Sequence, residues 1–195
     1  MARSNPTSGS SSDAPRDAIA LLKQDHRTVS ALFEEFEKAD DEEQSAIAQR
    51  VCQLLTVHAT IEEELLYPAA KQAFEDEEDD DLVNEAEVEH GTAKELIAKI
   101  EGMTSDDEHF KATVTVLGEY IKHHVKEEEN ELFPQLRKTE LDLKDLGARL
   151  ADRKFALMEQ MGIEEQEAPQ RKRTAARGAS RSKSNNRRSG SRARH

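Results

Sequence analysis

Two histidine-glutamate pairs recur along the chain, and both residue types are common metal ligands. His58 is followed four residues later by Glu62, and His124 is followed four residues later by Glu128. A step of four residues places both side chains of a pair on one face of a helix. Imidazole and carboxylate ligands together suit transition-metal ions such as iron, manganese and zinc. The pattern therefore predicts a metal site that is built from helices.

An internal repeat adds one further histidine to each pair. His26 lies 64 residues before His90, and His58 lies 66 residues before His124. All four histidines fall inside apolar stripes with helical spacing, so their side chains are expected to point inward. This spacing predicts two helical hairpins that are copies of one another and face each other in a bundle.

Metal binding explains these residues better than their ordinary structural roles do. A lone histidine on an apolar helical face is more often a hydrogen-bonded core residue, but four in repeated register favour ligands. Glu62 and Glu128 would both be buried, and two facing carboxylates repel unless cations lie between them. The neighbouring glutamates are expected on a solvated acidic face instead: Glu63, Glu64, Glu127 and Glu129.

Apolar periodicity predicts the elements that hold these residues. We expect five helices. The first ends near Lys38, the second runs from about Asp41 to Tyr67, and the third ends at Gly102. The fourth runs towards Pro134, and the fifth spans Thr139 to about Met161. The sequence thus predicts an all-α, up-and-down four-helix bundle with a short fifth helix.

Local signals mark the predicted helix ends. Asp13 and Pro15 supply helix-start chemistry for the first helix, and Pro68 is expected to end or kink the second. Seven consecutive acids, Glu75 to Asp81, are expected to precede the third helix. Ser105 and Glu108 have the spacing of a capping box that would open the fourth.

Composition divides the chain into a folded acidic body and polar ends. We expect one bundle domain over residues 13–165, a disordered segment over 1–12 and a disordered basic tail over 166–195. Residues 168–195 hold ten of the 28 Lys and Arg residues and none of the 41 acids. The segment 171–194 could contact nucleic acid or an anionic surface non-specifically, or remain a solvated arm.

The same composition bears on the compartment. A single cysteine, Cys52, forms no internal disulfide, and the first residues lack the apolar stretch of a secretory signal. No run of apolar residues reaches the roughly 18 to 20 needed to cross a bilayer. We therefore expect a cytoplasmic protein.

A histidine followed by His-xxx-Glu, and then the same series again, resembles the hemerythrin-like HHE cation-binding family over roughly residues 15 to 165. The resemblance implies two iron ions inside the bundle, with iron ahead of manganese and zinc. It further implies bridging carboxylates and terminal histidines, which are Glu62, Glu128, His26, His58, His90 and His124. Such ions would keep a coordination position open for a small ligand.

The chain departs from the oxygen-carrying members of this family. Those members add a second histidine one turn after the third-helix histidine, where this sequence has Lys94, and they use a longer spacing from histidine to aspartate in the fourth helix. The sequence leaves three functions open. These are binding or sensing of oxygen, nitric oxide or iron; a peroxidase, catalase-like or nitric-oxide-handling enzyme; and an interaction module with a structural metal.

Other polar residues near the predicted site are expected to have roles other than metal binding. His123 adjoins His124 but lies about 100° away around the helix, so we expect it to face solvent, as we do His109. Asp25 is a candidate hydrogen-bond partner for His26, although adjacent helical residues diverge. Tyr67 is expected to pack in the core or to place its hydroxyl at an interface, with contact to the metal pocket as the lesser alternative.

Overall fold

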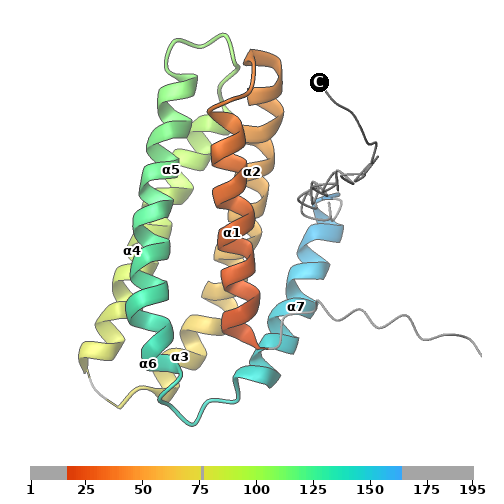
Figure 1. Cartoon of the computed structure of the whole chain (residues 1–195). Helices are drawn as coiled ribbons and strands as arrows, with labels where there is room; N and C mark the ends of the chain where they lie inside the picture. The colour runs from red at the N-terminus through yellow and green to blue at the C-terminus, as the bar shows by residue number, and fades with distance from the viewer. Residues whose placement is uncertain (1–16, 76, 164–195) are drawn as a thin grey trace, which may run out of the picture.

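The protein is a bundle of long antiparallel helices (Figure 1). A computed structural model describes residues 17–75 and 77–163, and all regular elements in them are helical. The elements are α1 (Ala18–Phe36), α2 (Asp41–Ile61), η1 (Glu62–Leu66), α3 (Tyr67–Ala73), α4 (Glu77–Glu101), α5 (Phe110–Glu127), η2 (Glu128–Leu132), α6 (Phe133–Leu136) and α7 (Leu143–Gln160). This confirms the predicted all-α bundle and its fifth helix.

Four long helical segments build the bundle, and α7 lies outside it. Helices α1 and α2 form one hairpin, and α4 and α5 form the second. Helix α7 packs on the side formed by α1 and α2 (Figure 1). The predicted disordered segment 1–12 and basic tail 166–195 lie outside the described residues. No described helix combines the length and apolar character needed to cross a bilayer.

Several predicted helix ends differ from those observed. Helix α1 begins at Ala18, where the Asp17 carboxylate accepts a hydrogen bond from the Ala20 backbone N–H over 2.8 Å; Asp13 and Pro15 lie outside the described residues. Helix α4 begins at Glu77, so the later acids of the run lie within its first turns and do not precede it. These differences leave the inward faces of both helices unchanged.

The predicted capping box at Ser105 is wrong. Helix α5 begins only at Phe110, and no side chain caps it. Instead, the Asp107 carboxylate accepts hydrogen bonds from the backbone N–H and the hydroxyl of Thr104, which stabilises a turn before the helix. A short polar side chain can bond nearby backbone groups in a turn as readily as at a helix start, so the spacing alone did not decide between them.

Pro68 was expected to end or kink its helix, and the helical chain continues past it. Proline has no N–H to donate to the carbonyl four residues earlier. The chain accommodates this with a wider π turn, in which the Tyr67 N–H bonds to the Glu62 carbonyl, and α3 continues to Ala73. The second repeat contains the same feature, where the Phe133 N–H bonds to the Glu128 carbonyl. Such single π turns are frequently found at functional sites.

The apolar core is divided into two clusters along the bundle. The first surrounds Leu22, Leu66 and Leu132, and the second surrounds Val51, Leu55 and Leu117. The buried polar residues of the chain include four histidines and two glutamates on helices that contribute to both clusters. The fold therefore places a polar layer within an otherwise apolar bundle.

Helix α7 seals one face of the first hairpin. Gly147 lies against the start of α1 so closely that an added Cβ would come within 2.6 Å of the Ala18 nitrogen. Farther along, Met158 and Ile163 form a small apolar cluster with the buried Val57 of α2. The tight crossing at Gly147 and this cluster fix α7 on the outer face of the first hairpin.

Candidate metal centre

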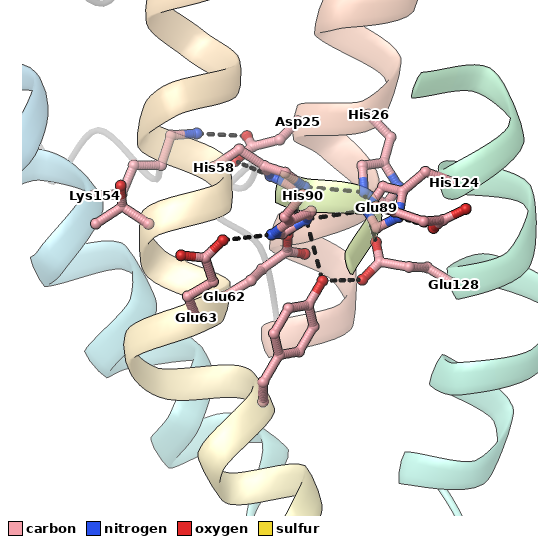
Figure 2. A network of polar contacts seen from close by, with 12 residues as sticks. Asp25, His26, His58, Glu62, Glu63, Glu89, His90, His124, Glu128 and Lys154 are labelled. Atoms are coloured by element: carbon pink, nitrogen blue, oxygen red, sulfur yellow. Dashed lines mark hydrogen bonds and ion pairs between the residues drawn. The ribbon is translucent and has the colours of Figure 1, made fainter. Parts of the chain in front are cut away.

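All six residues predicted as metal ligands meet in the buried layer of the bundle (Figure 2). Helices α1, α2, α4 and α5 each contribute one histidine, which are His26, His58, His90 and His124. The two glutamates, Glu62 and Glu128, begin the two π turns. Their exposed fractions lie between 0% and 6%. Six potential ligands are therefore held away from solvent on rigid elements.

The four imidazoles form two pairs that face inward through their Nε2 atoms. His26 Nε2 lies 3.2 Å from His58 Nε2, within the first hairpin. His90 Nε2 lies 3.2 Å from His124 Nε2, within the second hairpin. Each pair thus presents two ring nitrogens to one point, as residues that hold a metal ion do.

Each buried glutamate spans the two histidine pairs. Glu62 Oε2 lies 3.2 Å from His58 Nε2 and 3.4 Å from His90 Nε2. Glu128 Oε2 lies 3.3 Å from His26 Nε2 and 3.6 Å from His124 Nε2. A carboxylate that reaches both pairs is placed to bridge two ions. The potential ligand atoms of this buried centre form two overlapping groups, one around His26 and His58 and one around His90 and His124, that share Glu62.

An outer carboxylate faces the remaining Nδ1 atom of every imidazole. The distances are 3.0 Å from Glu129 to His26, 3.5 Å from Asp25 to His58, 3.0 Å from Glu63 to His90 and 2.7 Å from Glu89 to His124. A carboxylate at Nδ1 favours the tautomer that carries its proton there, which leaves the Nε2 lone pair free for a metal. Two of these contacts cross between the hairpins, and the other two join the two helices of one hairpin, so packing of the whole bundle orients the rings.

Two sequence expectations about these outer residues, those for Glu63 and Glu129, were wrong. Glu63 and Glu129 do not lie only on a solvated face, because each contacts an imidazole from a π turn. Asp25 faces His58 of the next helix and not its neighbour His26. Asp25 also forms an ion pair with Lys154 of α7. The signal that could have identified the acids is the repeat itself, since Asp25 and Glu89 occupy equivalent positions, as do Glu63 and Glu129.

The electrostatics of the centre fit a cationic occupant. Among the described residues, both oxygens of Glu62 lack a hydrogen-bond partner, as does Glu128 Oε2. Burial and the charge of Glu128 raise the pKa of Glu62 well above its ordinary value of 4.5. Burial and the nearby His124 lower the pKa of His90 to about 4. Bound cations would compensate the carboxylates and use neutral imidazoles such as that of His90 as ligands, so the donor set fits metal ions.

Tyr67 breaks the symmetry of the centre. Its hydroxyl lies 3.2 Å from His90 Nε2 and donates a hydrogen bond to Glu128 Oε1, also over 3.2 Å. The equivalent Phe133 instead stacks on His26, with ring centroids 5.9 Å apart. Burial and Glu128 raise the pKa of Tyr67 well above 10. One half of the centre therefore contains a protonated phenol, so the less favoured of the expectations for Tyr67 is the one that the contacts support.

A small cavity lies beside the four histidines. Its volume is about 30 Å³, and most of its wall is apolar, formed by Val29, Leu55, Ala93, Ile97 and Ile121 among others. A site of roughly 10 to 15 Å³ already holds one water molecule. The cavity is therefore large enough for a diatomic molecule in contact with the imidazoles.

Comparison with known proteins identifies the domain. Residues 17–136 match the hemerythrin HHE cation binding domain, which is more than half of the chain. A protein from Mycobacterium kansasii, described as containing a hemerythrin HHE cation binding domain, has a similar fold, with a TM-score of 0.64 and 21% identity. The similar region covers 74% of this chain and 88% of that one.

A curated relative is similar over part of its length. A protein of Nostoc sp. (strain PCC 7120), described as a DNA nickase, is 28% identical over 118 residues, which are 60% of this chain and 32% of that protein. The chain thus spans about a third of the length of this relative. With its matched domain and its buried cluster of histidines and glutamates, the chain belongs to the hemerythrin HHE cation-binding family.

Proposed function

We propose that this domain holds two iron ions and binds or senses a small ligand, oxygen or nitric oxide, beside them. His26 and His58 would hold one ion, His90 and His124 the other, and Glu62 with Glu128 would bridge them. Iron with imidazole and carboxylate ligands and one open position supplies reversible or redox chemistry towards such molecules. The chain itself contributes orientation of the ligands, exclusion of water and a pocket of limited size.

The observation that carries this proposal is the cavity of about 30 Å³ that contacts all four histidines. Its apolar wall favours an uncharged diatomic molecule over a hydrated ion. The outer carboxylates support the proposal further, because hydrogen bonds from Nδ1 to three of them hold the Nε2 atoms of His26, His90 and His124 towards the interior. Lys94 also lines the cavity and pairs with Glu63, so the cavity has one charged edge.

Narrowing the cavity tests the ligand-binding role. Ala93→Leu adds bulk to the cavity wall, and we expect it to retain iron while weakening nitric oxide or oxygen binding by about tenfold or more, since overpacking typically costs about 1 to 3 kcal/mol. Ala98→Leu is the matched control, because Ala98 is exposed on the same helix. The measurement is anaerobic titration of the reduced protein, followed by its optical spectrum. Equal ligand affinities in the two variants would contradict the proposed pocket.

A second candidate function is an enzyme that consumes peroxide, and Tyr67 favours it. A buried, protonated phenol between His90 and Glu128 is placed to hold or supply a proton at the centre. Catalytic consumption of peroxide by the iron-loaded protein, with a large loss in Tyr67→Phe, would favour the enzyme. A stable and reversible adduct with oxygen or nitric oxide would favour binding or sensing. Inertness to all three ligands, combined with unfolding when metal is removed, would favour a structural metal.

A further inference from the structure

The internal repeat gives the two hairpins equivalent outer faces, but the residues on these two faces differ in polarity and burial. Moving back 66 residues from His123 and Glu127 of α5 leads to Val57 and Ile61 of α2. Both α2 residues are buried, and Val57 packs against Met158 of α7 and against Ile163 just beyond it. The first face is thus apolar and covered. Its counterpart on α5 carries polar groups and has a solvent-exposed imidazole, with the side chain of His123 58% exposed.

The second face contains a cluster of potential metal ligands at its surface. His123 Nε2 lies 3.1 Å from Glu127 Oε1 and 3.9 Å from Glu89 Oε1. A groove passes over these residues, and the described residues that line it belong to α4 and α5. One imidazole and two carboxylates within 4.8 Å of one another can hold a divalent cation weakly while leaving it partly hydrated.

Glu89 connects this surface cluster to the buried centre. Its Oε1 faces His123, whereas its Oε2 accepts a hydrogen bond from His124 Nδ1 over 2.7 Å. Figure 2 shows Glu89 next to His124, on the side of the centre where Glu128 lies. On this side, Glu89 is therefore the single residue between the surface cluster and the buried centre.

A second small cavity borders both the surface cluster, at Glu89 and Glu127, and one residue of the buried centre, Glu128. It measures about 40 Å³ and is lined by Leu82, Ala86, Leu132 and five carboxylates, which are Glu85, Glu89, Glu127, Glu128 and Glu131. Glu128 is only 2% exposed, and its Oε2 accepts no hydrogen bond from the described residues. This oxygen lies 3.3 Å from His26 Nε2, so the residue that borders the cavity also reaches the buried centre. A buried carboxylate oxygen without a hydrogen-bond donor favours a cation.

Charge pairing favours cations on this face as well. Lysines pair with three of the four outer carboxylates: Lys154 with Asp25, Lys94 with Glu63 and Lys23 with Glu129. Among the described residues, Glu89 is the outer carboxylate that no lysine neutralises. A groove with one sign of charge raises the local concentration of counter-ions and their rate of arrival.

We propose that the groove formed by Glu89, His123 and Glu127 is the loading site through which ferrous ions reach the centre, with Glu128 as the first buried ligand to receive them. The inference rests on the proposed iron centre and adds how that centre is filled. His123 acts on the rate of loading and not on the final iron content, because it is not a ligand of the buried pair. The sealed face of the first hairpin offers no equivalent cluster among the described residues.

Rates of iron uptake test this proposal. Metal-free protein is mixed anaerobically with two equivalents of Fe²⁺, a ferrous chelator removes unbound iron at intervals, and the iron retained by the protein is counted. We expect His123→Ala combined with Glu127→Gln to slow uptake by roughly tenfold, because the loss of the cluster removes both ligation and steering. The final iron content should equal that of the wild type.

Matched controls separate the cluster from general effects of charge. His109→Ala combined with Glu119→Gln removes one exposed histidine and one exposed acid elsewhere on the second hairpin, and it should load at the wild-type rate. Equal uptake rates in the cluster variant and the wild type would overturn the loading route while leaving the iron centre intact. A wild type that retains no iron at any time would instead refute the proposed centre on which the route depends.

Discussion

Replacing Glu62 with glutamine is expected to abolish iron retention and, at the same time, to raise the Tm of the metal-free protein. Glu62 is fully buried, and neither of its oxygens has a hydrogen-bond partner among the described residues. A buried polar group without a hydrogen-bond partner lowers the free energy of unfolding by about 1 to 3 kcal/mol. For a domain of this size, that corresponds to a fall of roughly 3 to 10 °C in Tm. Glutamine keeps the shape and removes the charge, and its amide can donate to the neutral Nε2 atoms of His58 and His90.

The gain in stability should depend on pH with a definite sign. Burial and Glu128 raise the pKa of Glu62 in the folded protein above the ordinary value of 4.5. A raised carboxyl pKa stabilises the fold below pH 4.5, and this contribution is lost as the pH rises through the folded pKa. The Tm advantage of Glu62→Gln over the metal-free wild type should therefore be small at pH 4 and grow towards neutral pH.

Thermal unfolding with and without iron provides the measurement. Glu119→Gln, an exposed change on α5, is the control and should alter neither Tm nor iron content. Addition of iron should stabilise the wild type, since a ligand that binds only the folded state raises Tm, and should leave Glu62→Gln unaffected. A metal-free Glu62→Gln protein that is less stable than the wild type would show that the carboxylate has a structural partner.

The second large effect is expected at two adjacent histidines. His124→Ala should lower iron content sharply and remove the visible absorption of the iron-loaded protein, because His124 Nε2 faces His90 Nε2 and the Glu128 carboxylate. His123→Ala should leave both quantities near the wild type at equilibrium, since its ring lies outside the bundle. Iron counted after dialysis at saturation distinguishes the two.

Iron contents of these two variants can also contradict the proposed ligand set. Equal iron losses in His123→Ala and His124→Ala, or a greater loss with His123→Ala, would contradict the alignment of the two repeats from which the ligand set was drawn. The equilibrium measurement is independent of the uptake rate, in which His123 is proposed to act. A normal final iron content with slow loading in His123→Ala is therefore the combined expectation.

The inward positions of the six central residues could be predicted because they depend on local periodicity. His26, for example, lies four residues after Leu22 and three before Val29, which decides which way its ring points in any amphipathic helix. The spacing of His58 and Glu62 likewise requires only helical geometry. Two copies of the same pattern then predicted that the groups would converge, as the structure shows them to do.

The outer carboxylates could not be predicted in the same way. Asp25 lies beside His26 in sequence but serves His58, because the packing of α1 against α2 decides which ring it reaches. Glu63 contacts His90 from a π turn that the sequence signalled only as a proline within a helical pattern. These contacts depend on how separate helices face each other, which helical periodicity does not encode.

Helix α7 illustrates the same division between local and tertiary information. Its existence followed from apolar spacing, and Gly162, just beyond its end, has the positive φ of +65° that a glycine commonly adopts after a helix. Its position on the α1 and α2 face depends on the absence of a side chain at Gly147 and on the contact of Met158 with Val57. Nothing local in the sequence indicated that Lys154 would pair with Asp25 beside the centre.

The central claim is that six converging residues hold two iron ions, and counting metals in protein purified with its native content tests it most directly. Because there are two histidine pairs and both glutamates contact each pair, we expect about two iron ions per chain by elemental analysis. The same count should fall towards zero in Glu62→Gln and His124→Ala. A reproducible value of one ion per chain, or zinc alone after growth in iron-rich medium, would contradict the account.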